Sequence, residues 1–336
     1  MRIFSRWTAA LAMLAGAATA GAEAVAAEIA ELRISRQPSI LYIQTILMEE
    51  GKLIEKQAAS LGLPDLQVKF LTLTSGGVSV DSLLANQLDV VTSGVTNMLL
   101  AWGKTNGQAK SIGALVGMPL ILVTRNPDVK TISDFGAKDR IAVPTLKVSQ
   151  QATILGMALE QMYGPGQNGK LDSNQVQLGH PDATAAVLNP KHEVNSHFSA
   201  PPFYTVALKT SGVHAVLNSN DVLGGPATIT CAFALQSFVD ANPIKTKAFI
   251  AALDEANAMI AKDPKRAAEI YLAATKEKVS VEELVAMLTD KGSILSATPH
   301  HTMAYAEYMQ RIGLFKPKAA SWKDYFIPAL HGRDGS

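Results

Sequence analysis

A three-part unit recurs along the first third of this chain and limits the folds that the chain can adopt. Each unit has an apolar strand, then a polar or glycine-bearing loop, then apolar residues at helical spacing. The strands are LRIS at 32–35, LQVKFLTL at 66–73 and LDVVT at 88–92, and the first helix is expected over 40–61. This alternation predicts a parallel β-sheet covered by helices.

The same alternation returns in the second part of the chain. Strands are expected at 140–144, 175–178 and 193–198, and at 227–235 a further strand, ATITCAFAL, precedes several helices. We therefore predict two α/β lobes, with two crossovers between them near 115–123 and 217–229. The first lobe would comprise residues 28–118 and 225–336, and the second residues 119–224. Ligands of such folds bind beyond the carboxyl ends of the strands, which places the site between the lobes.

Residues 1–27 have the features of a secretory signal peptide. Arg2 and Arg6 come first, a run of apolar and small residues follows over 7–22, and the preferred cleavage site lies after Ala27. The run is too short and too weakly apolar to span a membrane, and no later stretch reaches the roughly 20 apolar residues that a spanning helix needs. We expect an exported, periplasmic protein, and we expect its single cysteine, Cys231, to be buried.

Charge and motif content narrow the possible functions. Without residues 1–27 the basic and acidic residues balance, which argues against a nucleic-acid partner because such a partner requires a basic surface. His300 and His301 are adjacent and cannot share one face, and no other His or Cys spacing indicates a metal site. The chain contains no nucleotide-binding loop, so any process that consumes ATP would need a separate ATPase. We expect no cofactor and no metal.

Four loops that follow strands or open helices have the chemistry to hold an anion. Backbone N–H groups at helix starts attract anions, and hydroxyl groups add donors. Serine and threonine also favour these positions as ordinary helix caps, so each loop has a purely structural interpretation. The candidate residues are Gln37, Pro38 and Ser39; Ser75, Gly76 and Gly77; Ser93, Gly94, Thr96 and Asn97; and Lys147, Ser149 and Gln150.

The stretch VNSHFSAPPF at 194–203 raises a further question. The chain carries His197, Phe198 and Ser199 to the end of a strand, and two prolines then end the strand. One interpretation is structural packing. The other is that the segment forms a wall of a binding cleft, with His197 charged near neutral pH to hold an acidic group and Phe198 stacked on the ligand.

These pieces, in this order, resemble one family. LRIS into RQPS, the strand into TSGG, LDVVTSGVTN, DRIAVPTLKVSQQA and VNSHFSAPPF are similar to the nitrate/sulfonate/taurine group of periplasmic substrate-binding proteins of ABC importers. The resemblance covers essentially all of the chain after the signal peptide. It implies an α/β, type II periplasmic-binding-protein fold, with two lobes and a hinge of two crossovers. It also implies a non-enzymatic, monomeric receptor that delivers a small anion to an ABC permease and its ATPase.

Several alternatives remain open at this point. The ligand could be a sulfonate, a taurine-like molecule, nitrate or a carboxylate, and Phe198 with the proline pair favours an organic anion. Arg36, His180 and Asp182 are further candidates for ligand contact. A receptor for a thiamine-precursor pyrimidine is the main alternative, although aromatic residues make up only 6% of the chain. A pyrimidine-synthase-like enzyme is disfavoured by the single cysteine and the export signal. A third class of function is a protein that binds the ligand and then docks to a membrane signalling protein.

Overall fold

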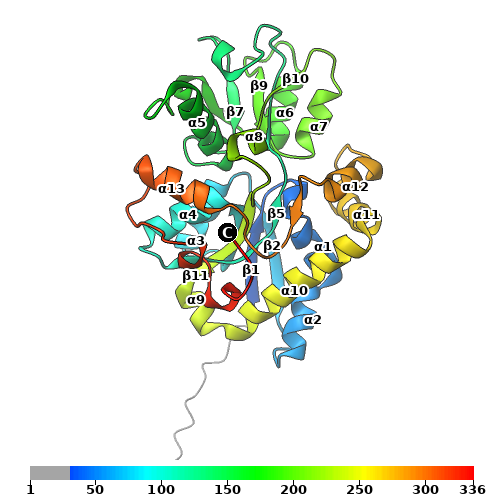
Figure 1. Cartoon of the computed structure of the whole chain (residues 1–336). Helices are drawn as coiled ribbons and strands as arrows, with labels where there is room; N and C mark the ends of the chain where they lie inside the picture. The colour runs from blue at the N-terminus through cyan, green and yellow to red at the C-terminus, as the bar shows by residue number, and fades with distance from the viewer. Residues whose placement is uncertain (1–30) are drawn as a thin grey trace, which may run out of the picture.

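The computed structural model describes residues 31–336, so the predicted signal peptide lies outside the described residues. Two lobes are stacked one above the other, each built around its own five-stranded sheet (Figure 1). The first sheet has the order β2-β1-β3-β11-β4 and the second has the order β10-β6-β9-β7-β8. A two-stranded ribbon of β5 and β12 lies near the junction. The α/β fold class predicted from the sequence, two lobes with two crossovers, is confirmed.

The first sheet contains the three strands that the sequence predicted. In it, β1 pairs in parallel with β2 and with β3, so the ends of these strands that precede helices all lie at one edge. The returning strand β11 is antiparallel to both β3 and β4. The strands are β1 Glu31–Arg36, β2 Gln67–Thr72, β3 Val90–Gly94, β4 Ala109–Ala114 and β11 Thr230–Leu235.

The helix predicted over 40–61 is divided in the structure. A 3-10 turn, η1 Ile40–Tyr42, leads into α1 Ile43–Gly51, and a separate helix α2 Leu53–Ser60 follows. The break falls at Lys52, whose φ of 48° lies in the left-handed region and cannot continue a right-handed helix. The other helices that follow the parallel strands are α3 Gly76–Leu84 and α4 Val95–Lys104.

The second sheet is built from residues between the two crossovers. Its parallel part is β7 between β8 and β9, while β6 is antiparallel to β9 and to β10. The strands are β6 Ile121–Thr124, β7 Ile141–Val143, β8 Gln175–Gln177, β9 Ser196–Ser199 and β10 His214–Asn218. The helices are η2 Ile132–Asp134, α5 Gln150–Tyr163, η3 Asp172–Asn174, α6 His180–Leu188, α7 Phe203–Leu208 and α8 Ser219–Leu223.

The two chain crossings lie side by side and are bonded to each other. Leu120 N donates to Ser219 Oγ at 2.9 Å, and Ser219 N donates back to Leu120 O at 2.9 Å. Below them, β5 Val116–Gly117 pairs with β12 Ile294–Leu295. These bonds connect the strands that leave and re-enter the first lobe. The lobe boundaries at 118/119 and 224/225 stay a prediction.

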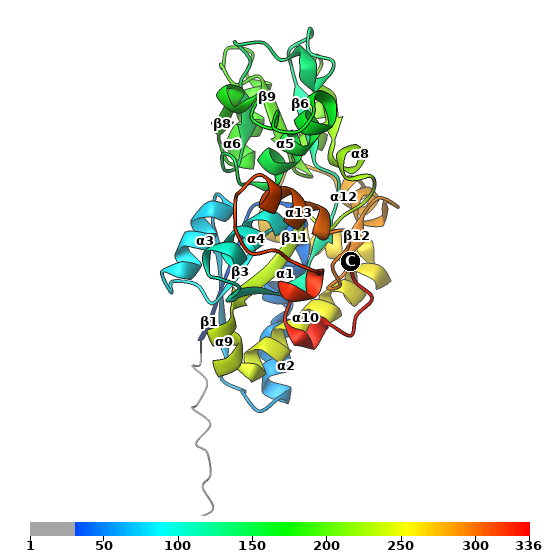
Figure 2. The same cartoon turned by 60° about the vertical axis from the view of Figure 1, so that its left-hand side comes forward.

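The remaining helices cover the first lobe and reach toward the second (Figure 2). They are α9 Gln236–Ala241, α10 Pro243–Lys262, α11 Pro264–Thr275, α12 Val281–Thr289, α13 Met303–Arg311, η4 Trp322–Asp324 and η5 Pro328–Leu330. At the start of α12, Ser280 and Glu283 form a capping box. Cys231 is buried, as expected. Over residues 31–336, no helix combines the length and apolar character needed to cross a bilayer.

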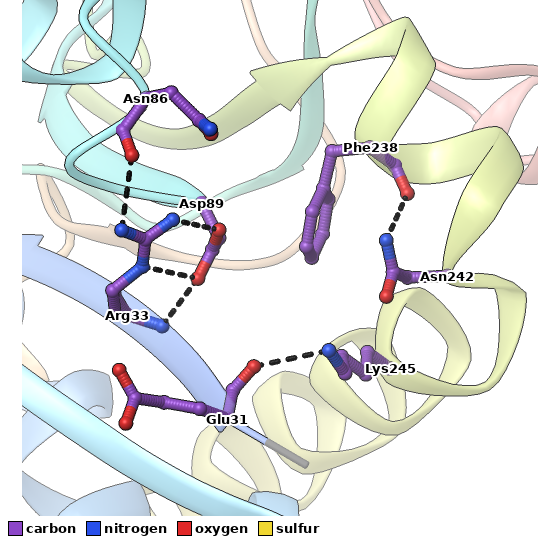
Figure 3. Close-up of polar contacts among 7 residues, drawn as sticks. All are labelled: Glu31, Arg33, Asn86, Asp89, Phe238, Asn242 and Lys245. Atoms are coloured by element: carbon purple, nitrogen blue, oxygen red, sulfur yellow. Dashed lines mark hydrogen bonds and ion pairs between the residues drawn. The ribbon is translucent and has the colours of Figure 1, made fainter. Parts of the chain in front are cut away.

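A polar cluster lies at the amino end of β1, in the first sheet (Figure 3). The Arg33 guanidinium donates to both carboxylate oxygens of Asp89, at 2.7 and 3.0 Å. Lys245 is almost fully buried there and donates to the backbone oxygen of Glu31 at 3.0 Å. A hollow of about 590 Å³ adjoins these residues, and Arg33 and Asp89 in its lining are paired with each other.

Candidate ligand site between the lobes

A small cavity lies between the two lobes, where strands of both sheets give way to helices. Its volume is about 30 Å³, roughly the space of two water molecules. Within residues 31–336, no Lys, Arg, Asp or Glu side chain lines it. These residues are Gln37, Ser39, Leu41, Tyr42, Gly76, Gly94, Asn97, Pro144, Ser149, Gln150, Gln151, His180, Ile229 and Thr230.

Helix starts from both lobes converge on this cavity. Gly76 opens α3, Gly94 precedes α4, Gln150 and Gln151 open α5, and His180 opens α6. The first amides of a helix have no intrahelical acceptor, and the helix dipole makes this end electropositive. The cavity therefore offers a positive potential and hydrogen-bond donors without any ionised side chain.

The predicted serines act as caps at the starts of η1, α3 and α5. Ser39 Oγ accepts from Leu41 N at 3.1 Å, Ser75 Oγ from Val78 N at 3.4 Å, and Ser149 Oγ from Ala152 N at 3.2 Å. Ser39 and Ser149 also line the cavity, whereas Ser75 lies outside it. The capping interpretation is confirmed for these three side chains, and ligand contact by Ser39 and Ser149 stays a prediction.

A hydrogen-bonded group in the first lobe forms one wall. Ser93 Oγ accepts from Asn97 Nδ2 at 3.0 Å and from Gln37 Nε2 at 3.3 Å, and Gln37 Nε2 also donates to the Tyr42 hydroxyl at 2.7 Å. Burial raises the pKa of Tyr42, so the hydroxyl stays protonated. Asn97 Oδ1 is buried and has no hydrogen-bond partner among the described residues.

Gly76 is required by the close packing of this wall. A Cβ atom there would lie 2.1 Å from Asn97 Nδ2 and 2.2 Å from Ser93 Oγ. The next glycine, Gly77, faces the other lobe, since its Cβ would lie 3.2 Å from Thr145 Cγ2. Gly77 itself does not line the cavity. The TSGG motif thus allows the start of α3 to approach both its neighbours and the second lobe.

Direct bonds hold the lobes together beside the cavity. Thr96 N donates to Gln150 Oε1 at 3.1 Å, and Thr96 Oγ1 donates to Val148 O at 3.0 Å. On the other side, Ser39 Oγ donates to Pro201 O. Thr96 and Gln150, which were both predicted to contact the ligand, therefore form hydrogen bonds between the lobes. The lobes are closed on each other in this structure.

A pair of histidines forms the wall of the second lobe. His180 Nδ1 lies 2.9 Å from His197 Nε2, and His180 Nε2 lies 3.3 Å from Gln151 Nε2. His180 lines the cavity, but His197 is fully buried behind it. Burial lowers the pKa of His180 to about 4, and burial together with His180 lowers the pKa of His197 well below its usual value. Both imidazoles are neutral near pH 7.

The expectation that a charged His197 meets the ligand is therefore wrong in this structure. His197 lies on β9, which is an inner strand of its sheet, and α6 covers this face with His180 and Thr184. Phe198 points to the opposite face, is fully buried in the hydrophobic core, and does not line the cavity. Ser199 is also fully buried and donates to Ala200 O at 3.3 Å.

Two further predicted residues lie away from the cavity. Lys147 is exposed, with a φ of 65° in the turn before α5. Pro38 lies on an adjoining groove instead of the cavity. Of the predicted residues, the structure brings Gln37, Ser39, Gly76, Gly94, Asn97, Ser149 and Gln150 together around one space.

No protein-family model matches the chain, and no curated protein matches it. Several solved structures are similar to this chain. The alkanesulfonate-binding protein SsuA from Xanthomonas axonopodis pv. citri, bound to MOPS, has a TM-score of 0.69 and 16% identity over 87% of this chain and 96% of that chain. The periplasmic nitrate-binding protein NrtA from Synechocystis PCC 6803 has a TM-score of 0.65 and 14% identity, over 88% of this chain and 84% of that one.

A third similar structure is a Candida albicans gene product described as having the generic periplasmic-binding-protein fold. Its TM-score is 0.65 at 14% identity, over 86% of this chain and 92% of that chain. The chain has the periplasmic-binding-protein fold. The resemblance drawn from the sequence is confirmed at the level of the fold, and the ligand must be argued from the site itself because one fold serves many functions.

Within this periplasmic-binding-protein fold, sequence reasoning missed several residues of the site. Tyr42, Gln151 and Thr230 line the cavity, and His180 had been only a secondary candidate. A signal existed for Gln151, which follows Gln150 at a predicted helix start. No local signal pointed to Thr230, because β11 returns to the cleft from the far end of the chain.

A larger groove adjoins the cavity on the side of α6, α7 and α11. Its volume is about 660 Å³, and Gln37, Ser39 and Tyr42 line both spaces. Arg36 lies in this groove, but its guanidinium pairs with Glu49 and lies 5.1 Å from the centre of the Phe70 ring. The interlobe cleft thus has a compact polar compartment and an open, more apolar one.

Proposed function

We propose that the protein is an exported solute receptor that binds a small anion between its lobes and delivers it to an ABC permease. The observation that carries this proposal is the cavity at the starts of α3, α4, α5 and α6, to which the described part of the chain contributes no ionised side chain. Helix starts hold anions through backbone N–H groups and the helix dipole. A carboxylate in the wall would oppose an anion, and no Asp or Glu of the described residues lines the cavity.

The size of the cavity supports a compact anionic group in this position. About 30 Å³ leaves no room for the body of an organic molecule, so that body would extend into the adjoining groove. An alkanesulfonate or a carboxylate has this shape. The similar structures named for alkanesulfonate and nitrate support the anion class. We place the protein in the periplasm as a monomer and a non-enzyme, without a cofactor.

The cavity gives less support to a flat pyrimidine. Tyr42 is the one aromatic residue in its lining besides the imidazole of His180, and the cavity volume is smaller than a ring requires. A pyrimidine would also lack the charge that the helix starts favour. The anion hypothesis therefore explains more of the site.

Ligand screening by thermal shift tests the proposal. The protein is first unfolded and refolded to remove any co-purified ligand, and then mixed with alkanesulfonates, taurine, nitrate, carboxylates and pyrimidines. A ligand at 100 times its dissociation constant stabilises a protein by about 2.7 kcal/mol, which raises the melting temperature measurably. Stabilisation by one or more anions supports the receptor. Stabilisation by pyrimidines alone would overturn the anion proposal.

A further inference from the structure

A chain of hydrogen bonds runs from the second-lobe sheet to the cavity. Thr184 Oγ1 lies 3.5 Å from His197 Nδ1, and His197 Nε2 lies 2.9 Å from His180 Nδ1. His180 Nε2 in turn lies 3.3 Å from Gln151 Nε2. These four side chains come from α5, α6 and β9, and all are buried. Of the four, Gln151 and His180 line the cavity, whereas Thr184 and His197 lie behind it.

The threonine end fixes the direction in which this chain donates. A hydroxyl group carries one hydrogen, and its oxygen can accept others. Thr184 Oγ1 donates its hydrogen to His180 O at 2.8 Å, which lies four positions earlier in α6. Towards His197 the hydroxyl can therefore only accept. The hydrogen of the His197 ring must then lie on Nδ1, which leaves Nε2 as a bare acceptor.

The same direction continues to the cavity. Burial lowers the pKa of both imidazoles, so each ring carries a single hydrogen near pH 7. Because His197 Nε2 is bare, His180 donates to it from Nδ1 and keeps its own Nε2 as an acceptor. The amide nitrogen of Gln151, which is a donor, lies at that acceptor. Both ends of the chain thus require the same arrangement, with the hydrogen on Nδ1 of each ring.

The chain fixes an amide group that could otherwise turn around. The oxygen and nitrogen of a glutamine amide have nearly the same size, so the group can exchange them by a half turn. A half turn of Gln151 would place its oxygen against the bare His180 Nε2, and two acceptors do not bond. Phe203 stacks on the His180 ring with 5.6 Å between the centroids and 18° between the planes, which holds the imidazole in place.

This arrangement makes Gln151 the polar contact that the histidine wall can offer. Both nitrogens of His180 are already bonded, so its ring has no hydrogen-bonding atom left for a ligand. Within residues 31–336, the Gln151 amide makes no hydrogen bond other than the one to His180. The rest of its hydrogen-bonding capacity is therefore not used by the described protein at the cavity that it lines.

We propose that Thr184 is a positioning residue for ligand binding, which fixes the Gln151 amide through His197 and His180, and that Gln151 contacts the bound anion. The inference rests on the proposed anion receptor for its ligand. Without the Thr184 hydroxyl, His197 Nδ1–H would be a buried donor without an acceptor, which is costly. Moving the hydrogen of each ring to Nε2 removes this cost and turns the Gln151 oxygen towards His180.

Nitrogen NMR of the imidazole rings tests the arrangement in the ligand-free protein. A ring nitrogen with a hydrogen and one without have well-separated ¹⁵N chemical shifts, so spectra at pH 7 identify the tautomer of each histidine. We expect Nδ1–H on His180 and His197 in the wild type and in Thr184→Ser, which keeps the hydroxyl. Thr184→Val should move both hydrogens to Nε2. Nε2–H on either ring of the wild type, or Nδ1–H on both rings of folded Thr184→Val, would overturn the proposal.

Calorimetric titration of an alkanesulfonate and of nitrate tests the connection to the ligand. Thr184→Val should weaken anion binding by about three- to tenfold, the effect of one hydrogen bond, and Thr184→Ser should regain the affinity. Thr246→Val is the matched control and should bind like the wild type, because Thr246 makes the same bond to a backbone oxygen four positions earlier, on α10. In a Gln151→Ala background, Thr184→Val should cause no further loss. An equal loss in both backgrounds would overturn the proposal.

The two experiments distinguish failure of this inference from failure of the receptor proposal. If the wild type binds no anion, the receptor proposal fails, and the tautomers measured without ligand still decide whether the hydrogen-bond chain exists. If an anion binds but the tautomers differ from Nδ1–H, only this inference fails. The wild-type spectrum decides this point even if Thr184→Val does not fold.

Discussion

His180 Nδ1 lies 2.9 Å from His197 Nε2, and this bond connects the second-lobe sheet to the cavity wall. His197 is on the strand that ends at the cleft, but His180, at the start of α6, is the residue that reaches the cavity. The relationship makes His197 a positioning residue for His180.

Replacing His197 by alanine should destabilise the protein, because it leaves a space in the core and a buried His180 nitrogen without its partner. We expect a loss of about 2–4 kcal/mol in the free energy of unfolding. Urea denaturation of the folded variant measures this loss. His180→Ala, at the cavity wall, should reduce the anion affinity more than it reduces the free energy of unfolding. If both variants lost the same anion affinity and neither lost stability, this division of roles between His180 and His197 would be contradicted.

The histidine pair should make the protein sensitive to acid. The pKa of His180 falls from 6.5 to about 4 because burial disfavours the charged form, so its contribution to stability is complete above pH 6.5 and is lost as the pH falls through about 4. A shift of this size corresponds to at most about 3 kcal/mol. Denaturant unfolding between pH 7 and pH 4 should show this loss, and His180→Gln should make the profile flatter.

Glu277 should act with the opposite sign. Burial raises its pKa from 4.5 to about 7, so stability is highest below pH 4.5 from this group and declines as the pH rises through 7. The decline is at most about 3 kcal/mol, and partial exposure to solvent reduces it. At pH 8, Glu277→Gln should therefore be more stable than the wild type in urea, whereas Glu269→Gln should not. A destabilised Glu277→Gln at pH 8 would show that the carboxylate has a partner.

The glycine at the start of α3 should tolerate no side chain. A Cβ on Gly76 would overlap Asn97 and Ser93, so Gly76→Ala must displace the wall of the cavity. We expect a destabilisation of about 1–3 kcal/mol, as for overpacking, together with reduced anion affinity. Gly332→Ala is the matched control, because no atom lies within 4 Å of the added Cβ. Wild-type affinity in Gly76→Ala would exclude this wall from the site.

The general architecture was readable from the sequence because local patterns encode it. Strand, loop and helix alternate with different periods, and these periods predicted β1, β2 and β3 and the helix starts after them. The break at Lys52 was missed because nothing in its side chain requires a left-handed backbone. Strand β10 was also missed, since it lies at the sheet edge and is only partly buried, with a weak apolar pattern.

The site was predicted only in part, because local sequence patterns do not determine tertiary packing. Local motifs identify helix starts, and seven residues from such loops do surround the cavity. They do not tell which face of β9 meets solvent, because that depends on how α6 covers the sheet. His197 and Phe198 were therefore candidates for ligand contact, whereas tertiary packing buries both side chains.

Calorimetric titration of an alkanesulfonate and of nitrate into the refolded protein tests the central claim most directly. We predict saturable binding of at least one anion at a single site. Because no ionised side chain lines the cavity, the affinity should depend only weakly on salt concentration. Binding should also survive Glu277→Gln and be weakened by Gly76→Ala. Absence of binding for every anion tested, or an affinity that Gly76→Ala leaves unchanged, would contradict the assignment of this cavity as an anion site.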